Sequence, residues 1–243
     1  MTEWVGRIIL GKEWVLYVGE GGRTPMHRHL AHKVVIGLDA PVEITKAQTG
    51  PRFKRLHVVR PGELHEVGAA NTRVGLLFVD AGTFRHTVVP TPGTFKALMA
   101  LFKQLDAGDT AVLDSLLQVL TISTQQAVDP RVAAVVDQLR SPVDTSLVGI
   151  AAGIGLSTGR LSHLFSSHIG ASPARYRRWR RLRVALEWLG RGERIVDAAL
   201  AAGFSDEAHL NRTCVEMIGI TPGVFRANQV VSLASSASIS PMQ

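Results

Sequence analysis

Two similar stretches in the second half of the chain decide its fold: LVGIAAGIGLSTGRLSHLFSSHIGASP at residues 147–173, and IVDAALAAGFSDEAHLNRTCVEMIGITP at residues 195–222. Each has a short Ala-rich segment, a Gly turn, a longer segment with helical periodicity, and then Ile-Gly-x-Ser/Thr-Pro. Small alanines allow two helices to cross closely, as helix-turn-helix units require. This internal repeat therefore predicts two helix-turn-helix units in one domain.

An arginine-rich segment, RYRRWRRLRVALEWL at residues 175–189, separates the two repeats. Six of the nine residues 175–183 are Arg, and the apolar residues recur at helical spacing. This pattern predicts a long helix that is buried on one side and cationic on the other. A solvated face usually mixes charges of both signs, so the single-sign run favours contacts with phosphates, which we assign to Arg177, Arg178 and Arg181.

Helix start signals recur throughout residues 129–228, and this region is expected to be all-helical. Asp129, Ser172 and Thr221 each precede a proline, which is the pattern of an N-cap followed by Pro at the first helical position. Ser157 and Ser205 are the predicted N-caps of two further helices. The remaining residues, 229–243, are rich in Ser and are predicted to form a flexible tail.

The first 92 residues have a different pattern of apolar residues and turns. Short apolar runs alternate with Gly- and Pro-containing turns, which is typical of a β-sandwich or β-barrel. In residues 93–128 the apolar residues recur at helical spacing, and the segment ends in a polar stretch. We interpret them as a helical relay or dimerisation segment followed by a linker. The predicted class is α+β with two domains: an N-terminal barrel plus helices, and a C-terminal all-α domain.

Composition narrows the functional classes. The chain has 243 residues, 27 Lys+Arg against 20 Asp+Glu, and a formal charge of +7, which favours an anionic partner such as nucleic acid. Its single cysteine excludes an intrachain disulfide. No run approaches the ~18–20 apolar residues needed to cross a membrane, and the N-terminus has no signal-peptide pattern. We therefore expect a cytoplasmic protein without membrane partners.

The repeats and the arginine-rich segment together resemble the DNA-binding domain of the AraC/XylS transcriptional regulators over residues 129–226. The resemblance implies two helix-turn-helix units, held apart by the long helix, that enter successive major grooves of double-stranded DNA. It also implies RNA polymerase and a second copy of the chain as possible further partners.

The family's base-contacting positions can be transferred to the second helix of each unit. Arg212 could bind a guanine with two hydrogen bonds, and Asn211 could pair with an adenine. His163 stands where Arg is frequent, so the first half-site would be read differently. The transferred positions are Gly159, Arg160, Ser162 and His163 in the first unit, and Glu207, Ala208, His209, Asn211 and Arg212 in the second.

The second unit departs from the family at Leu210 and Cys214, where Phe is usual. These are expected core positions, so the packing inside that helix should differ. We interpret Cys214 as a small buried hydrophobic residue and not as a redox sensor.

The N-terminal half has two histidine motifs, PMHRHLAHKVVIGLD at residues 25–39 and VVRPGELHEV at residues 58–67. It resembles the cupin-like sensor domain that precedes the DNA-binding domain in many such regulators. In metal-binding cupins the matching residues are ligands, so the resemblance implies that His27, His29 and His65 could hold one divalent transition metal. The usual Glu is absent: Lys33 or Val34 falls near its place, with His32 close by.

Two further interpretations of this histidine group stay open. Lys33 would oppose a cation, and it suits an anionic small effector instead. The effector would then be bound by His27, His29, His32, Lys33 and His65. Alternatively, the histidines are structural groups inside the barrel.

The combined features predict a sequence-specific transcription regulator whose sensor domain binds a small ligand or a metal. We expect no enzymatic activity, because no separate acid–base pair, nucleophile motif or nucleotide-binding loop is visible. Two alternatives remain: a cupin-type metalloenzyme, and a regulator whose barrel serves only for dimerisation.

Overall fold

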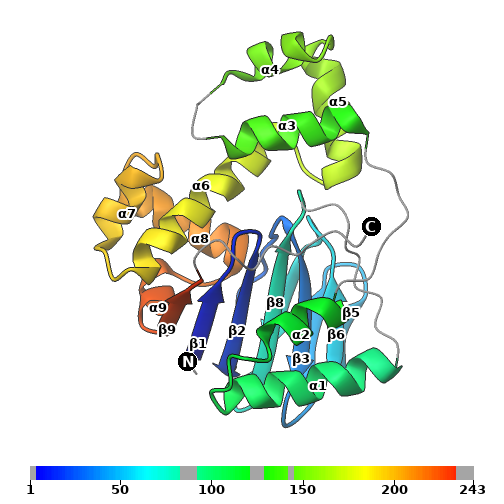
Figure 1. Cartoon of the computed structure of the whole chain (residues 1–243), viewed down its shortest axis with the longest axis vertical. Helices are drawn as coiled ribbons and strands as arrows, with labels where there is room; N and C mark the ends of the chain where they lie inside the picture. Colours follow the sequence, from blue (N-terminus) through cyan, green and yellow to red (C-terminus); the bar gives the residue numbers. More distant parts are fainter. Residues whose placement is uncertain (1–3, 83–91, 121–128, 142–144, 234–243) are drawn as a thin grey trace.

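The computed structural model describes residues 4–82, 92–120, 129–141 and 145–233, which form a sheet-rich domain followed by a helical domain (Figure 1). The predicted α+β class with two domains is confirmed. In Figure 1 the strands fill the lower part of the molecule, and the helices of the second domain lie above and beside them.

The larger sheet has six strands in the order β6-β3-β8-β2-β1-β9. Neighbouring strands are antiparallel, except that β9 runs parallel to β1. The strands are β1 (Val5–Leu10), β2 (Trp14–Glu20), β3 (Ala31–Gly37), β6 (Leu56–Val59), β8 (Arg73–Asp80) and β9 (Gln229–Ser232).

Strand β9 follows the helical domain in sequence but completes the sheet of the first domain. The predicted flexible tail is therefore wrong for residues 229–232, because the backbone of this segment pairs with β1. Residues 234–243 of that tail lie outside the described residues.

A smaller sheet consists of β5 (Gly50–Lys54), β4 (Val42–Lys46) and β7 (His65–Gly68), in that order. Apolar residues of both sheets, including Val35, Ile44 and Val67, belong to one core. No strand pairing within the described residues joins the two sheets, so the predicted barrel is a pair of open sheets that are not closed into a ring. The smaller sheet ends at β5, whose side chains are mostly exposed.

Both faces of the larger sheet are buried, because successive side chains of a strand point to opposite faces. On β2, Leu16 and Val18 face α1 (Pro92–Asp106) and α2 (Leu113–Leu120), the helices predicted for the relay segment. Tyr17 points to the opposite face, toward the helical domain. The part of the predicted linker at residues 121–128 lies outside the described residues.

The second domain is helical, and most of its predicted caps are present. Asp129, Ser157, Ser172 and Thr221 accept backbone hydrogen bonds at helix N-termini. The prediction for Ser205 is wrong, since the next residue, Asp206, accepts the bond from the His209 N–H. The helices are α3 (Pro130–Arg140), α4 (Leu147–Gly153), α5 (Thr158–Ile169), α6 (Pro173–Gly190), α7 (Ile195–Ala201), α8 (Glu207–Ile218) and α9 (Pro222–Arg226).

The two predicted repeats correspond to the helix pairs α4–α5 and α7–α8, with α6 running between them (Figure 1). The larger sheet and the helical domain share a continuous core, in which Ile8 and Leu76 belong to the same cluster as Trp179, Leu186 and Phe225. The helical domain is thus docked on the sheet face opposite to α1 and α2.

Candidate DNA interface and effector pocket

The second helix of each unit presents most of its transferred DNA-reading residues to solvent. On α5, Ser162 is partly buried, and on α8 the same is true of His209. The other transferred residues are exposed: Gly159, Arg160, His163, Glu207, Ala208, Asn211 and Arg212. These side chains are accessible to a DNA groove, and their contacts with bases stay a prediction.

The opposite side of α8 packs inward. Leu210 and Cys214 are fully buried, and burial raises the pKa of the Cys214 thiol to about 12. The interpretation of Cys214 as a hydrophobic core residue is confirmed. His209 is more constrained than its place in the motif suggests, because its ring contacts Phe204 edge-to-face and its Nδ1 lies 3.2 Å from Ser205 Oγ.

The three arginines assigned to phosphates all have intramolecular partners. Arg177 donates to the carbonyl of Thr145, just before α4, and Arg181 donates to the carbonyl of Gly203, at the turn after α7. Each therefore attaches one helix-turn-helix unit to α6. Arg178 forms an ion pair with Glu216 of α8, at 2.9 Å. The single-sign charge run is explained largely by internal contacts, and its phosphate contacts stay a prediction.

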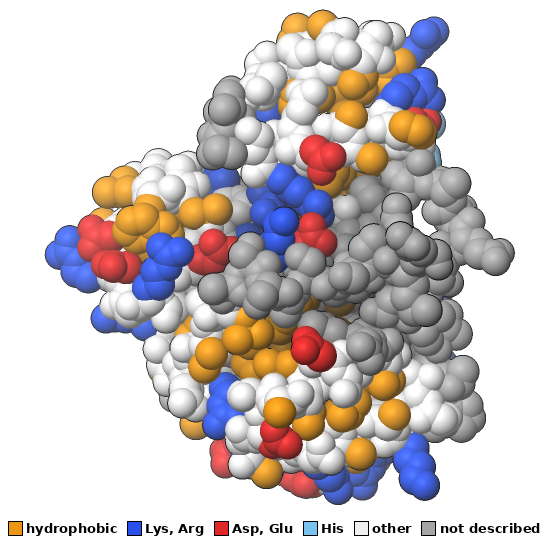
Figure 2. All heavy atoms as spheres, viewed as in Figure 1, with side chains coloured by type: hydrophobic (Ala, Val, Ile, Leu, Met, Phe, Trp, Pro, Cys, Tyr) orange, Lys and Arg blue, Asp and Glu red, His pale blue; other side chains and the backbone are white. Residues whose placement is uncertain are grey.

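The other three arginines of the run contact the sheet-rich first domain, the predicted sensor domain. Arg175 donates to the carbonyl of Arg28 at 3.2 Å. Arg183 is 4% exposed and donates to the carbonyls of Gly11, at 2.7 Å, and Trp14, at 3.2 Å. The third, Arg180, reaches a carboxylate described below. Figure 2 shows basic side chains gathered in the middle of the molecule, near α6.

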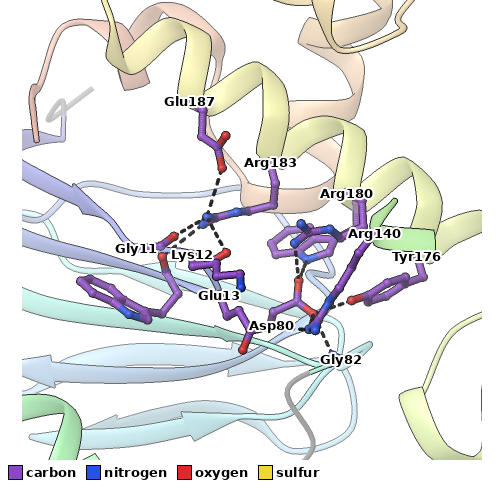
Figure 3. Close-up of polar contacts among 12 residues, drawn as sticks. Gly11, Lys12, Glu13, Asp80, Gly82, Arg140, Tyr176, Arg180, Arg183 and Glu187 are labelled. Carbon is purple, nitrogen blue, oxygen red and sulfur yellow. Dashed lines mark hydrogen bonds and ion pairs between the residues drawn. The ribbon is translucent and has the colours of Figure 1, made fainter. Parts of the chain in front are cut away.

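Asp80 is the main polar anchor between the two domains (Figure 3). It ends β8, is 3% exposed, and points to the same face as Phe78. Its carboxylate accepts hydrogen bonds from the Tyr176 hydroxyl at 2.8 Å, the Trp179 indole N–H at 3.0 Å and Arg180 at 3.4 Å. Three side chains of α6 thus converge on one acid of the sensor domain.

Arg140 at the end of α3 extends this network. It pairs with Glu13 at 2.9 Å and approaches Asp80 at 3.8 Å, so α3 is attached to the same point as α6. Neither Asp80 nor Arg140 was predicted from the sequence as a functional residue. An available signal was the single acid that follows the apolar run of β8, since a charge at the end of a buried strand needs partners.

An apolar pocket lies at the junction of the two domains. The space between its walls is about 690 Å³ when the open solvent at its mouth is counted, so the pocket is partly open and not an enclosed cavity. Both domains contribute walls: Ile8, Val15, Tyr17, Leu76 and Phe78 from the sensor domain, and Trp179, Leu186, Ile218, Ile220 and Phe225 from the helical domain. An occupant of this pocket would touch both domains at once.

Lys33 is the unusual group in this pocket. Its side chain is 1% exposed, and its Nζ lies 5.0 Å from the centre of the Phe78 ring and 3.4 Å from His65 Nε2. Burial lowers the pKa of Lys33 to about 7. No carboxylate of the described residues pairs with this amine. A buried cation without an anionic partner is costly, and burial accordingly favours the neutral form of this amine.

The histidines predicted to bind an effector or metal are divided by the fold. His27, His29 and His65 are buried together, next to Lys33. Burial, reinforced by the Lys33 charge, lowers the pKa of His27 to about 3 and of His65 to about 2, and lowers that of His29 as well. His32 is separated from this group, because alternation on β3 puts it on the opposite face from Lys33.

Comparisons with known proteins agree with this geometry. A family model described as a helix-turn-helix domain matches residues 150–228. A comparison with curated protein sequences gave no match.

Within the described residues, no helix is both long and apolar enough to span a membrane.

Two similar solved structures are of ToxT from Vibrio cholerae, one bound to an unsaturated fatty acid and one to (E)-4-(8-methylnaphthalen-1-yl)but-3-enoic acid. Both are 8% identical with a TM-score of 0.60 and cover 89% of this chain, and 95% and 100% of theirs. At this identity the likeness concerns the two-domain fold.

A third similar structure is an AraC-type DNA-binding regulator from Chromobacterium violaceum. It is 31% identical, covers 40% of this chain and 90% of its own, and has a TM-score of 0.38. The matched helix-turn-helix model and the paired units around α6 agree with each other. The chain belongs to the AraC/XylS family of transcriptional regulators.

Proposed function

We propose that this DNA-binding regulator is controlled by an amphipathic carboxylic acid that binds in the pocket between its two domains. The apolar walls would hold the hydrocarbon part, and the amine of Lys33 would hold the carboxylate. The single observation that carries the proposal is the fully buried Lys33 in a mostly apolar pocket, without an acidic partner in the described part of the chain.

The chemistry of the pocket favours an anion over a neutral ligand. A charge-assisted hydrogen bond from Lys33 to a carboxylate would compensate for the burial of the amine. The two ToxT ligands named above both combine an apolar body with a carboxylate, and this supports the same ligand class for a chain of similar fold. Thr24 and Asn228 also line the pocket and add polar atoms near its walls.

Control of DNA reading would follow from the position of the pocket. A ligand shifts a conformational equilibrium only by the difference in its affinity for the two states. Because Trp179 and Phe225 of the helical domain line the same pocket as Tyr17 and Phe78 of the sheet, an occupant distinguishes docked from displaced arrangements of the domains. Because Ile218 of α8 lines the pocket, the bound acid thereby alters the position of α8 on DNA.

The family assignment supports binding to DNA as the output of this molecule, and turnover of the ligand forms no part of the proposal. A barrel that serves only for dimerisation would leave the buried amine of Lys33 and the apolar pocket without a role.

The test measures binding of oleic acid to the full-length protein through tryptophan fluorescence, since Trp4 and Trp179 line the pocket. Oleyl alcohol is the matched neutral ligand. We expect the acid to bind tighter than the alcohol. The variant Lys33→Met should weaken acid binding about 10- to 100-fold, the usual worth of a hydrogen bond to a charged group, and leave the alcohol unaffected. Lys54→Met, at an exposed position, is the control.

The second arm measures DNA affinity on a site selected by the full-length protein from random DNA. Saturating oleic acid should change the dissociation constant by about fivefold or more, which is the lower end of typical allosteric coupling. Equal binding of acid and alcohol, or unchanged binding by Lys33→Met, would overturn the proposed ligand class. Tight acid binding without any effect on DNA affinity would overturn the proposed control.

A further inference from the structure

His27, His29 and His65 form a compact group beside the pocket. They are 2%, 0% and 0% exposed, and each offers a ring nitrogen within 4.8 Å of those of the others. The backbones of His27 and His65 bond to each other in both directions, at 2.9 and 3.1 Å. This pairing holds the two rings on the same side, with their centres 4.3 Å apart.

The hydrogen bonds of these rings leave lone pairs pointing into the group. His27 Nδ1 lies 2.9 Å from the Pro25 carbonyl, and His65 Nδ1 lies 3.0 Å from the Glu63 carbonyl. Because a carbonyl only accepts, each Nδ1 carries the hydrogen and each Nε2 presents a lone pair. Buried polar atoms without partners are costly and uncommon.

Only one of these lone pairs has a donor nearby. Lys33 Nζ lies 3.4 Å from His65 Nε2. His27 Nε2 and both ring nitrogens of His29 are buried without a hydrogen-bond partner. The group therefore offers three imidazoles and lacks an electron acceptor at its centre.

We propose that His27, His29 and His65 bind a divalent transition-metal ion, and that this ion links the sensor domain to the second helix-turn-helix unit. A metal-binding histidine usually donates a hydrogen bond from the ring nitrogen that does not bind the metal, often to a backbone carbonyl, and this bond fixes the orientation of the ring. A tetrahedral zinc ion with Zn–N bonds of about 2.1 Å needs nitrogens roughly 3.4 Å apart. The ring nitrogens lie within 4.8 Å of one another, so they would have to approach by up to about 1.4 Å. The ion would supply the missing positive centre and an open coordination position.

The link to DNA reading runs through the residue between two of these ligands. The Arg28 N–H donates to the carbonyl of Glu216 at 3.2 Å, and the Arg28 carbonyl accepts from Arg175 at 3.2 Å. One ligand segment is thus bonded to both α8 and α6. At the end of α8, Gly219 lies so close to His27 that a Cβ there would be 2.9 Å from Nδ1. If the ion draws the histidines together, the position at which α8 packs against the first domain must therefore change.

The metal site is separate from the proposed acid site, although Lys33 borders both. The ion would bind the lone pair of His65 Nε2, which Lys33 Nζ now contacts at 3.4 Å. The amine of Lys33 would then be available to a ligand in the pocket. Because the ion and the amine repel each other, an anion in the pocket and an ion in the histidine group should each favour the other. Metal binding itself does not depend on the acid.

The test uses the full-length protein, stripped with a chelator and then titrated with Zn²⁺ without fatty acid. Elemental mass spectrometry should find about one ion per chain, as for a single dedicated site. Addition of Co²⁺ should give the visible absorption bands of tetrahedral or five-coordinate cobalt. His29→Gln and His65→Gln should lose both signals, with unchanged far-ultraviolet circular dichroism as evidence of folding.

His57→Gln is the matched control, because His57 is buried but bonds to the Val42 carbonyl outside the group. It should keep the full metal content. Zn²⁺ should change the affinity of the wild type and His57→Gln for the selected DNA site by about fivefold or more, and leave His29→Gln unaffected. Lys33→Met should still bind Zn²⁺, which distinguishes this site from the acid site.

A wild type that holds no Zn²⁺ or Co²⁺ at micromolar free metal would overturn the site, whatever the variants do. Equal metal content in His29→Gln, His65→Gln and His57→Gln would do the same. A bound ion without effect on DNA affinity would overturn the link to α8.

Discussion

The two helix-turn-helix units share one sequence pattern, yet the sensor domain holds them differently. The first unit, α4–α5, meets the sensor domain where Gly170 lies against the Pro61–Gly62 turn. The second, α7–α8, is bonded through Glu216 to Arg28 and continues through α9 into β9 of the sensor sheet. Similar sequences thus give one loosely attached reader and one that is built into the sensor.

This difference gives each unit a separate role. A change in the pocket or in the histidine group reaches α8 directly, because Ile218 lines the pocket and Gly219 contacts His27. It reaches α5 less directly, through α6 and through the Pro61–Gly62 turn, where the Gly62 N–H donates to the His29 carbonyl. We infer that the second unit carries the regulation and that the first supplies constant DNA affinity.

The largest expected effect comes from cutting the anchor of α6. Asp80→Asn removes the charge that Tyr176, Trp179 and Arg180 surround. Breaking a buried charged pair typically costs about 3–5 kcal/mol, so urea unfolding should show a loss of this size. Asp39→Asn, at an exposed turn, should be close to neutral. Wild-type stability of Asp80→Asn would mean that the anchor does not hold the domains together.

A second prediction compares the two units at equivalent glycines. Gly170 and Gly219 both end a recognition helix in the left-handed region, with φ of 78° and 76°. Alanine at either should lose roughly 1–2 kcal/mol of unfolding free energy through backbone strain.

The surroundings of the two glycines separate them further. A Cβ at Gly219 would lie 2.7 Å from Thr24 Cβ, whereas one at Gly170 would lie 3.2 Å from the Pro61 carbonyl oxygen. Overpacking should therefore cost Gly219→Ala about 1–3 kcal/mol more than Gly170→Ala. Chemical denaturation of both variants checks this, and equal losses would remove the claimed difference between the units.

A third prediction concerns base reading. Arg212→Ala should weaken binding to the selected DNA site by about 1–3 kcal/mol and have little effect on random DNA. Arg160→Ala is the counterpart on α5. Fluorescence anisotropy on both DNAs separates the two contributions. An equal loss on specific and random DNA would make Arg212 a phosphate contact.

The smallest expected effect lies in the salt dependence. Two lost phosphate contacts would reduce the slope of log K against log salt by about 1.8. We expect a smaller reduction for Arg177→Gln with Arg181→Gln, because these guanidinium groups already donate to the carbonyls of Thr145 and Gly203. A reduction of the slope by about 1.8 would instead show that both arginines contact DNA phosphates.

Local signals in the sequence predicted most of the helical domain. Caps such as Ser157 and Ser172 act within one turn, so they can be recognised without tertiary structure. The edge strand β5, with the sequence GPRFK, has no alternation of apolar and polar residues by which it could be recognised, and its side chains are mostly exposed. Strand β9 was missed for another reason, since its pairing with β1 joins segments more than 200 residues apart.

In the candidate sites, too, features with a local sequence signal were predictable and features that depend on distant contacts were not. The group of His27, His29 and His65 was predictable from its motifs, whereas the contacts of Asp80 and Arg183 between the domains depend on the tertiary fold. The separation of His32 from Lys33 depends on strand alternation, which could have been applied to residues 31–37 once they were assigned to a strand. The arginine-rich helix was interpreted from charge alone, and its partners became visible only in the fold.

The most direct test of the account is hydrogen–deuterium exchange of the full-length protein with and without oleic acid. The account predicts that changes in protection concentrate in α8, α9 and β9 and in the segment containing Arg28, while α5 stays unchanged. Changes spread equally over α5 and α8, or confined to α5, would contradict the claim that the sensor acts through the second reader.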